Sequence, residues 1–167
     1  SLSPDGKTVL FTSGSTEAGD IYYNDKIFLV PAAGGPAKIL LPDVPYETSN
    51  AQWSKDGKTI FFLANLGVHD EILKVDVATR QATPITKGDH ALAGWNFAED
   101  AGLHVFTRNT ADRPSEIYTL SSAANASMTR VTSRRISSRI GAYCAWRSRS
   151  GTVILVVVLI LWEELSV

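Results

Sequence analysis

The chain has 167 residues and a formal net charge of −1, from 16 Lys and Arg against 17 Asp and Glu. This length allows one ordinary domain with a sizeable core, and the single cysteine, Cys144, excludes an intrachain disulfide framework. The charge is distributed unevenly along the chain. Residues 1–120 carry ten Lys and Arg against fifteen Asp and Glu, whereas residues 121–167 carry six Arg, no Lys and two Glu.

Residues 1–43 form the first predicted unit, in which four short strands are joined by tight turns. The Asp5-Gly6 pair predicts a chain reversal, because the Asp side chain can bond its own backbone and Gly tolerates positive φ. A third strand at 26–30 then runs into the turn Pro-Ala-Ala-Gly-Gly-Pro. This turn leads into a fourth strand at 38–40.

The same pattern returns in residues 44–88 and 89–132. Residues 54–62 repeat residues 3–11, including a second Asp-Gly pair at Asp56-Gly57, and residues 95–106 repeat them more loosely. The third strands, at 26–30, 71–75 and 116–120, stand 45 residues apart. The fourth strands, at 38–40, 84–86 and 130–132, stand 46 residues apart. A fixed period near 45 indicates an array in which each unit cannot bury its apolar face alone.

Four strands in a unit of about 45 residues are typical of a propeller blade. No long apolar pattern of helical period appears in residues 1–132, so the predicted class is all-β. We expect a partial β-propeller of about three four-stranded antiparallel blades, followed by an irregular C-terminal tail. Trp53 and Trp95 are expected to open the first strands of units two and three and to pack between adjacent blades, with Leu2 in the equivalent place of unit one.

Three blades are too few to close a propeller, which typically has about 4–8. Because the chain starts at Ser1, inside the first repeat, we expect it to be an internal piece of a larger protein. Neither a signal peptide nor a twin-Arg leader is visible, and after such a start this carries no meaning. Bacterial cytoplasm and periplasm or secretion both stay open as the compartment.

The tail, residues 133–167, departs from the repeat. Its Arg- and Ser-rich part is interpreted as a solvated stretch rather than a basic patch for nucleic acid, because no recognisable binding motif accompanies the arginines. The ten apolar residues at 153–162 are half of the about 20 that a membrane-spanning helix needs, so no transmembrane span is expected. A buried strand, a short helix and an aggregation-prone end stay open. A further interpretation is a non-native continuation, as after a shifted reading frame.

No catalytic, cofactor-binding or metal-binding residue is predicted. A Gly-x-Ser-x-Gly nucleophile elbow is absent, and Ser15 is interpreted as a turn residue in a polar loop. The histidines His69, His90 and His104 are spaced too irregularly for a local zinc motif. We expect His104 to be a packed strand residue rather than a base.

The remaining candidate motifs are also assigned no function. His69, Asp70 and Glu71 are expected to form a solvated loop before a third strand. The Asp-Gly turns lack the spacing to Glu that an EF-hand calcium loop requires. The triplet 125–127, Asn-Ala-Ser, fits a glycosylation acceptor but is discounted, because such triplets are common by chance.

Residues 3–11, 27–35 and 53–58 resemble the WD40-like, PD40-type repeats of the β-propellers in TolB and in the prolyl oligopeptidase family of serine peptidases. The resemblance covers residues 1–132. Within that superfamily, the phrase Pro-Tyr-Glu running into Gln-Trp-Ser, and the Val-Pro-Ala-Ala-Gly-Gly turn, look most similar to bacterial dipeptidyl-aminopeptidase or acylaminoacyl-peptidase propellers.

The resemblance implies a propeller that precedes an α/β-hydrolase domain carrying Ser, Asp and His, and that filters peptides through its channel or side opening. None of those three residues maps onto this chain. The leading hypothesis is therefore a non-catalytic propeller fragment, which gates and positions the peptide substrate of a parent serine peptidase with further blades and a hydrolase domain. The alternative is a TolB-like propeller that acts as a protein-binding module.

Overall fold

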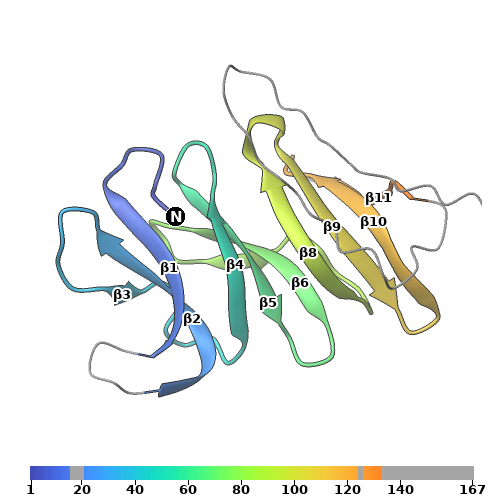
Figure 1. The fold of residues 1–167 in the computed structure, drawn as a ribbon, viewed down its shortest axis with the longest axis horizontal. Helices are drawn as coiled ribbons and strands as arrows, with labels where there is room; N and C mark the ends of the chain where they lie inside the picture. The colour runs from blue at the N-terminus through green and yellow to red at the C-terminus, as the bar shows by residue number, and fades with distance from the viewer. Residues whose placement is uncertain (16–20, 124–125, 133–167) are drawn as a thin grey trace, which may run out of the picture. The chain divides into compact units, whose positions relative to one another are not determined.

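Three antiparallel sheets follow one another along the chain (Figure 1). The structure is a computed structural model that describes residues 1–15, 21–123 and 126–132. Within these residues it has eleven strands, one short 3-10 helix and no α-helix. The predicted all-β class is therefore confirmed. The predicted tail, with its apolar run, lies outside the described residues.

Each sheet is built from consecutive strands of the chain. The first sheet contains β1 (Thr8–Ser15), β2 (Ile21–Pro31) and β3 (Lys38–Ile39). The second contains β4 (Glu47–Trp53), β5 (Thr59–Asn65), β6 (Asp70–Asp76) and β7 (Ala82–Pro84). The third contains β8 (Ala91–Ala98), β9 (Leu103–Thr110), β10 (Arg113–Ser121) and β11 (Thr129–Arg130). The limits of the predicted units, 1–43, 44–88 and 89–132, stay predictions.

The two Asp-Gly turns are built alike. Between β4 and β5, Ser54 Oγ accepts a hydrogen bond from the Thr59 N–H (2.9 Å) and donates one to the Asp56 carboxylate (2.7 Å). Gly57 follows with φ of +69°, a value that glycine adopts without a steric penalty. The equivalent residues within 3–8 repeat both bonds, at 2.9 and 2.6 Å, and Gly6 has φ of +72°. Both predicted reversals are confirmed.

The third unit reverses through a short 3-10 helix, η1 (Glu99–Ala101), instead of an Asp-Gly pair. Gly102 ends this helix with φ of +57° and donates its N–H to the Glu99 carbonyl (3.1 Å). The length of the reversal is unchanged from unit to unit. The paired residues that enclose it are Leu2 with Val9, Trp53 with Ile60, and Phe97 with His104.

This equivalence corrects the expected place of the tryptophans. Trp53 is the last residue of β4 rather than its first, and its counterpart in the third unit is Phe97, not Trp95. Both tryptophans are buried in the cores between sheets, which confirms their predicted packing. Leu2 occupies the equivalent place in the first unit, but its side chain is 56 % exposed.

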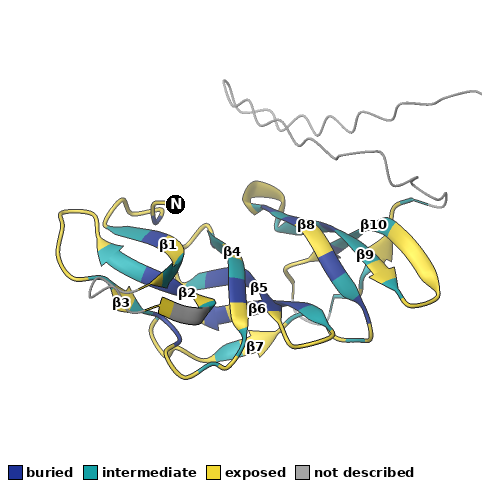
Figure 2. Cartoon of the chain, turned by 60° about the horizontal axis from the view of Figure 1, so that its bottom comes forward, coloured by how far each residue is buried: buried dark blue, intermediate teal, exposed yellow. Residues whose placement is uncertain are grey.

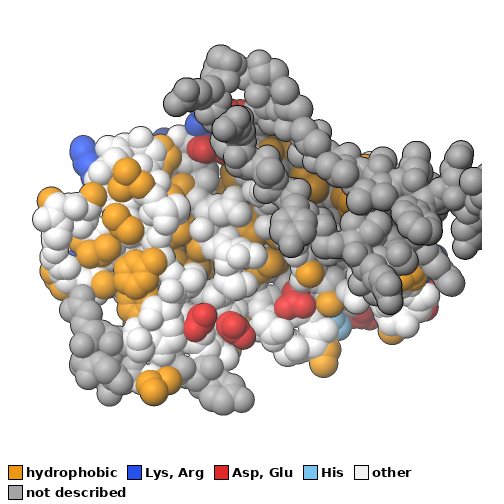
Figure 3. Space-filling view, in the orientation of Figure 1, with side chains coloured by type: hydrophobic (Ala, Val, Ile, Leu, Met, Phe, Trp, Pro, Cys, Tyr) orange, Lys and Arg blue, Asp and Glu red, His pale blue; other side chains and the backbone are white. Residues whose placement is uncertain are grey.

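The first sheet has three strands rather than the predicted four. The strand before its Asp-Gly turn is reduced to a single bridge between Leu2 and Val9. Hydrophobic side chains gather on the surface over β1, β2 and β3 (Figure 3).

The three units nevertheless end in the same way. The same backbone hydrogen bond recurs in all three units. The N–H groups of Leu40, Ile85 and Val131 donate to the carbonyls of Ile27, Ile72 and Ile117, respectively, at 2.8, 2.9 and 2.8 Å.

Two hydrophobic cores lie between consecutive sheets, so the middle sheet is buried on both faces (Figure 2). Alternate residues of a strand point to opposite faces. Ile60 and Phe62 of β5 accordingly enter the core shared with the first sheet, whereas Phe61 and Leu63 enter the core shared with the third. The packing of one sheet against the next therefore supplies the burial that no single unit achieves.

Replacing Gly57 tests the role of the turn that precedes β5. We expect Gly57→Ala to lower the free energy of unfolding by about 1 kcal/mol, because positive φ is strained for a residue with a Cβ atom. Gly57→Asn is the matched control and should lose less, since Asn tolerates this region. Urea unfolding of the 167-residue chain measures both. A Gly57→Ala variant as stable as the wild type would contradict the assignment.

Candidate functional site

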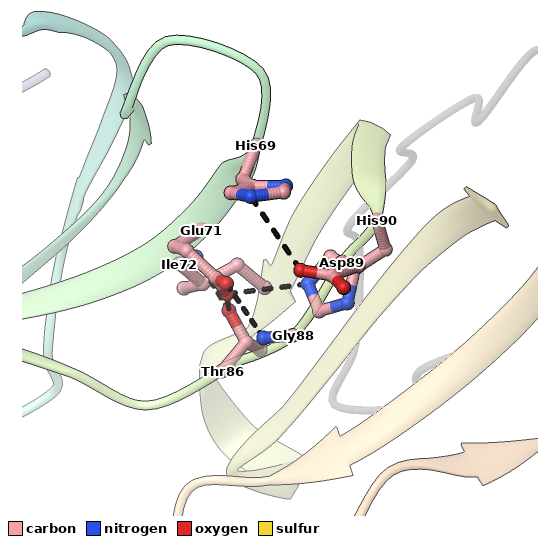
Figure 4. A network of polar contacts seen from close by, with 7 residues as sticks. All are labelled: His69, Glu71, Ile72, Thr86, Gly88, Asp89 and His90. Atoms are coloured by element: carbon pink, nitrogen blue, oxygen red, sulfur yellow. Dashed lines mark hydrogen bonds and ion pairs between the residues drawn. The ribbon is translucent and has the colours of Figure 1, made fainter. Parts of the chain in front are cut away.

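A buried polar cluster lies where the second sheet connects to the third (Figure 4). Glu71 belongs to β6, and Thr86 and His90 belong to the segment that leads from β7 into β8. All three residues are buried, with 3 to 5 % of their surface exposed. Since a buried carboxylate is costly unless it is hydrogen-bonded, its partners decide what this cluster can do.

The Glu71 carboxylate has three hydrogen-bond donors around it. One oxygen accepts from the Thr86 hydroxyl (2.5 Å) and lies 3.2 Å from His90 Nε2, while the other accepts from the Gly88 backbone N–H (2.9 Å). Thr86 Oγ also accepts a hydrogen bond from the Ile72 N–H (2.8 Å). The carboxylate therefore fastens the β7–β8 connection to the start of β6.

Glycine at position 88 allows the backbone of the β7–β8 connection to pass close to the His90 ring. Gly88 has φ of +148°, and a Cβ atom there would lie 3.1 Å from His90 Nδ1. At the surface of the same connection, His69 Nε2 lies 3.5 Å from the Asp89 carboxylate. These side chains are 37 and 99 % exposed, so this second pair contributes little to stability.

The geometry of the cluster does not match a hydrolytic triad. In a triad the nucleophile's hydroxyl faces a histidine, and the acid orients that histidine from its far side. Here the Thr86 hydroxyl donates to the carboxylate itself, and His90 contacts the same carboxylate. The Thr86 hydroxyl proton is thus directed to the carboxylate rather than to the imidazole. The cluster is therefore built as a structural tie.

The same position carries a charge in every unit, which indicates a repeated tie. Lys26, Glu71 and Glu116 stand at equivalent places in the third strands. The Lys26 ammonium is buried and donates to the carbonyl of Val44, in the segment that leads into β4. Glu116 accepts a hydrogen bond from Arg130 of β11 (3.1 Å). In the first two units this position binds the connection to the next sheet.

His104 forms a second buried site, in the core between the second and third sheets. Its ring is fully buried and lies 4.5 Å from the ring of Phe97 and 4.8 Å from that of Phe61. Trp95 Nε1 donates a hydrogen bond to His104 Nδ1 (3.2 Å), which places the imidazole proton on Nε2. Burial lowers the pKa of His104 to about 4, so the ring is neutral at pH 7. The predicted packed strand histidine is thereby confirmed.

The other sequence candidates lie apart from both sites. Ser15 is exposed at the end of β1, where its N–H donates to Ser13 Oγ (3.1 Å). The prediction that Glu71 lies in a solvated loop is wrong: Glu71 is buried, because it lies inside β6 and not in the loop before it. The glycosylation triplet begins outside the described residues.

Two further findings concern the described residues alone. No helix in the described part of the chain combines the length and apolar character needed to cross a membrane. Over the same residues, no three His, Cys, Asp or Glu side chains lie close enough together to hold a metal ion.

Comparison with known sequences finds one curated relative at low identity. No family model matches the chain. The chain is 27 % identical over 119 residues to dipeptidyl-peptidase 5 of Porphyromonas gingivalis. The match covers 70 % of this chain and 17 % of that protein, so the chain spans about a sixth of the relative's length.

Comparison with solved structures shows the propeller fold. A TolB protein from Agrobacterium tumefaciens superposes with a TM-score of 0.61 at 21 % identity, over 80 % of this chain and 45 % of that one. The β-propeller domain of the Trilobed protease from Pyrococcus furiosus gives 0.60 at 21 %, over 77 and 35 %. The predicted resemblance to TolB and to peptidase propellers is confirmed at the level of the fold.

Removing the Glu71 carboxylate tests the tie. We expect Glu71→Ala to lower the free energy of unfolding by about 3–5 kcal/mol, because three buried donors would lose their acceptor. Glu47→Ala, at the exposed start of β4, is the matched control and should change stability by less than about 0.5 kcal/mol. Chemical denaturation of both variants gives the comparison. Equal effects would refute the tie.

The buried imidazole predicts a pH dependence of stability. The folded pKa of about 4 lies below the unfolded value of 6.5, so only the unfolded chain gains a proton on His104 between these values. Stability that is complete above pH 6.5 should therefore fall by about 3 kcal/mol as the pH approaches 4. His104→Ile, the residue found at position 60, should remove this loss, whereas His69→Gln should keep it. Parallel pH profiles for wild type and His104→Ile would contradict the prediction.

Proposed function

We propose that the chain is a non-catalytic propeller portion of a serine peptidase of the prolyl oligopeptidase family. In the parent enzyme it would gate and position short peptides. The sequence match to dipeptidyl-peptidase 5 carries this proposal, because it extends over 119 residues and 70 % of the chain. The propeller fold alone supports many functions, so the structural neighbours cannot select among them.

The parent would supply what the described residues do not bring together. Acyl transfer by a serine peptidase needs a nucleophile, a base and donors for the oxyanion. The two histidine sites of this chain serve packing instead: His90 is held on Glu71, and His104 is enclosed by aromatic rings. The proposed partners are accordingly a peptide substrate, further blades and an α/β-hydrolase domain.

The second candidate is a TolB-like propeller that binds other proteins. It is favoured by the TolB structure, which superposes over 80 % of the chain. The coding sequence downstream, read in all three frames, separates the two candidates. A Gly-x-Ser-x-Gly elbow followed by an acidic residue and a histidine supports the peptidase. Its absence in every frame supports the binding module.

The longer gene product tests the gating role. If the propeller filters substrates, kcat/KM should fall steeply once peptides exceed the length that the propeller admits. The matched control is the hydrolase domain with the propeller removed, provided that it folds. An intact enzyme that cleaves long and short peptides with equal kcat/KM would count against gating.

The 167-residue chain should itself have no peptidase activity. Removal of a catalytic triad leaves only weak residual catalysis even where substrate binding survives. Release of product from dipeptidyl and acyl-peptide chromogenic substrates measures this directly. Turnover that survives repurification and is blocked by a serine-directed inhibitor would overturn the prediction.

A further inference from the structure

The first sheet presents an apolar face that the other two sheets bury. Five positions form this face in each unit. In the second sheet they are Trp53, Ile60, Phe62, Leu73 and Val75, all 0 to 8 % exposed. In the first sheet they are Leu2, Val9, Phe11, Phe28 and Val30. Leu2 is 56 % exposed and Phe11 is 39 % exposed, Val9 and Val30 are half-buried, and Phe28, whose ring stacks 5.2 Å from that of Phe11, is 5 % exposed. A contiguous apolar patch on the surface is a common feature of interaction sites.

The third sheet offers the complementary face. Phe61 and Ile72 of the second sheet belong to the core shared with the third sheet, and they are 6 and 0 % exposed. Their counterparts in the third sheet are Val105 and Ile117, which are only half-buried. The first and third sheets thus each have one face that no other described sheet covers. The equivalent faces of the second sheet are both buried against neighbouring sheets.

The contact between the second and third sheets also includes a hydrogen bond between a backbone N–H and an amide side chain, which the outer sheets can repeat. The Gln52 side-chain oxygen accepts a hydrogen bond from the Phe97 N–H (3.3 Å). Asn96 stands at the position of Gln52 in the third unit, and Leu2 stands at that of Phe97 in the first. The same pairing of an amide side chain with a backbone N–H is therefore available between a third sheet and a first sheet.

We propose that the exposed face of the first sheet binds the third sheet of a second copy of this chain. Within the chain, the first sheet packs against the second and the second against the third. The proposed contact between copies would use the same two kinds of face. It is head-to-tail, and two copies would bring together six sheets, within the about 4–8 of known propellers. In a longer parent a neighbouring blade would take the same place, so the pairing concerns the 167-residue chain.

Sedimentation of the 167-residue chain and its variants tests this pairing. We expect the wild type to associate reversibly, with a dimer of twice 18.1 kDa, and Phe11→Lys to weaken association by about 100-fold or more, because an unpaired ammonium would be buried. Leu2→Lys, at an already exposed residue, should do the same without a cost in folding. Val68→Lys is the matched control, since Val68 is 84 % exposed in the β5–β6 loop, and should leave association unchanged.

Mixing variants distinguishes a head-to-tail contact from other modes. Ile117→Lys should also weaken association, whereas a mixture of Phe11→Lys with Ile117→Lys retains one native contact and should recover part of it. Circular dichroism checks that each variant is folded. A monomeric wild type would overturn the proposal. Association that survives both Phe11→Lys and Leu2→Lys, or a mixture without recovery, would overturn it as well.

Discussion

The burial of apolar sheet faces between neighbouring sheets is the constraint on which the rest of this structure depends. A strand such as β5 sends Ile60 and Phe62 to one side and Phe61 and Leu63 to the other, so both faces of its sheet require cover. At about 25 cal/mol per Å² of apolar surface, neither face can be left in water without a large loss. Only neighbouring sheets provide this cover. The repeat period of the sequence thus follows from the packing of the sheets rather than from a catalytic or binding function.

Polar ties add direction to this non-directional packing. The charged position at 26, 71 and 116 binds the connection to the next sheet in the first two units, and a fourth-strand arginine in the third. Lys55 and Asp100 join the reversals of the second and third sheets (2.9 Å), although both side chains are largely exposed. The buried ties are costly to break, because each lost partner leaves a desolvated polar group. They therefore favour one arrangement of consecutive sheets over other apolar contacts.

The turns and the repeat period could be predicted from the sequence. The burial of individual side chains and the strand register could not. Asp56-Gly57 predicted its reversal because a short side chain and a missing Cβ act locally. The burial of Glu71 could not be foreseen, since its partners Thr86 and His90 lie 15 to 19 residues away. The recurrence of a charged residue at positions 26, 71 and 116 was the available signal. The truncated first strand and the shift between Trp53 and Trp95 became visible only through strand register.

Hydrogen exchange of individual backbone amides tests the central claim most directly, because it reports the free energy of local opening along the chain. If stability comes from packing between neighbouring sheets, the slowest amides should lie in β5 and β6, whose sheet is covered on both faces. Amides of β1 and β10 should exchange faster, since each outer sheet has a neighbour on one face among the described residues. Protection that is uniform over the three sheets, or greatest in an outer one, would contradict this account.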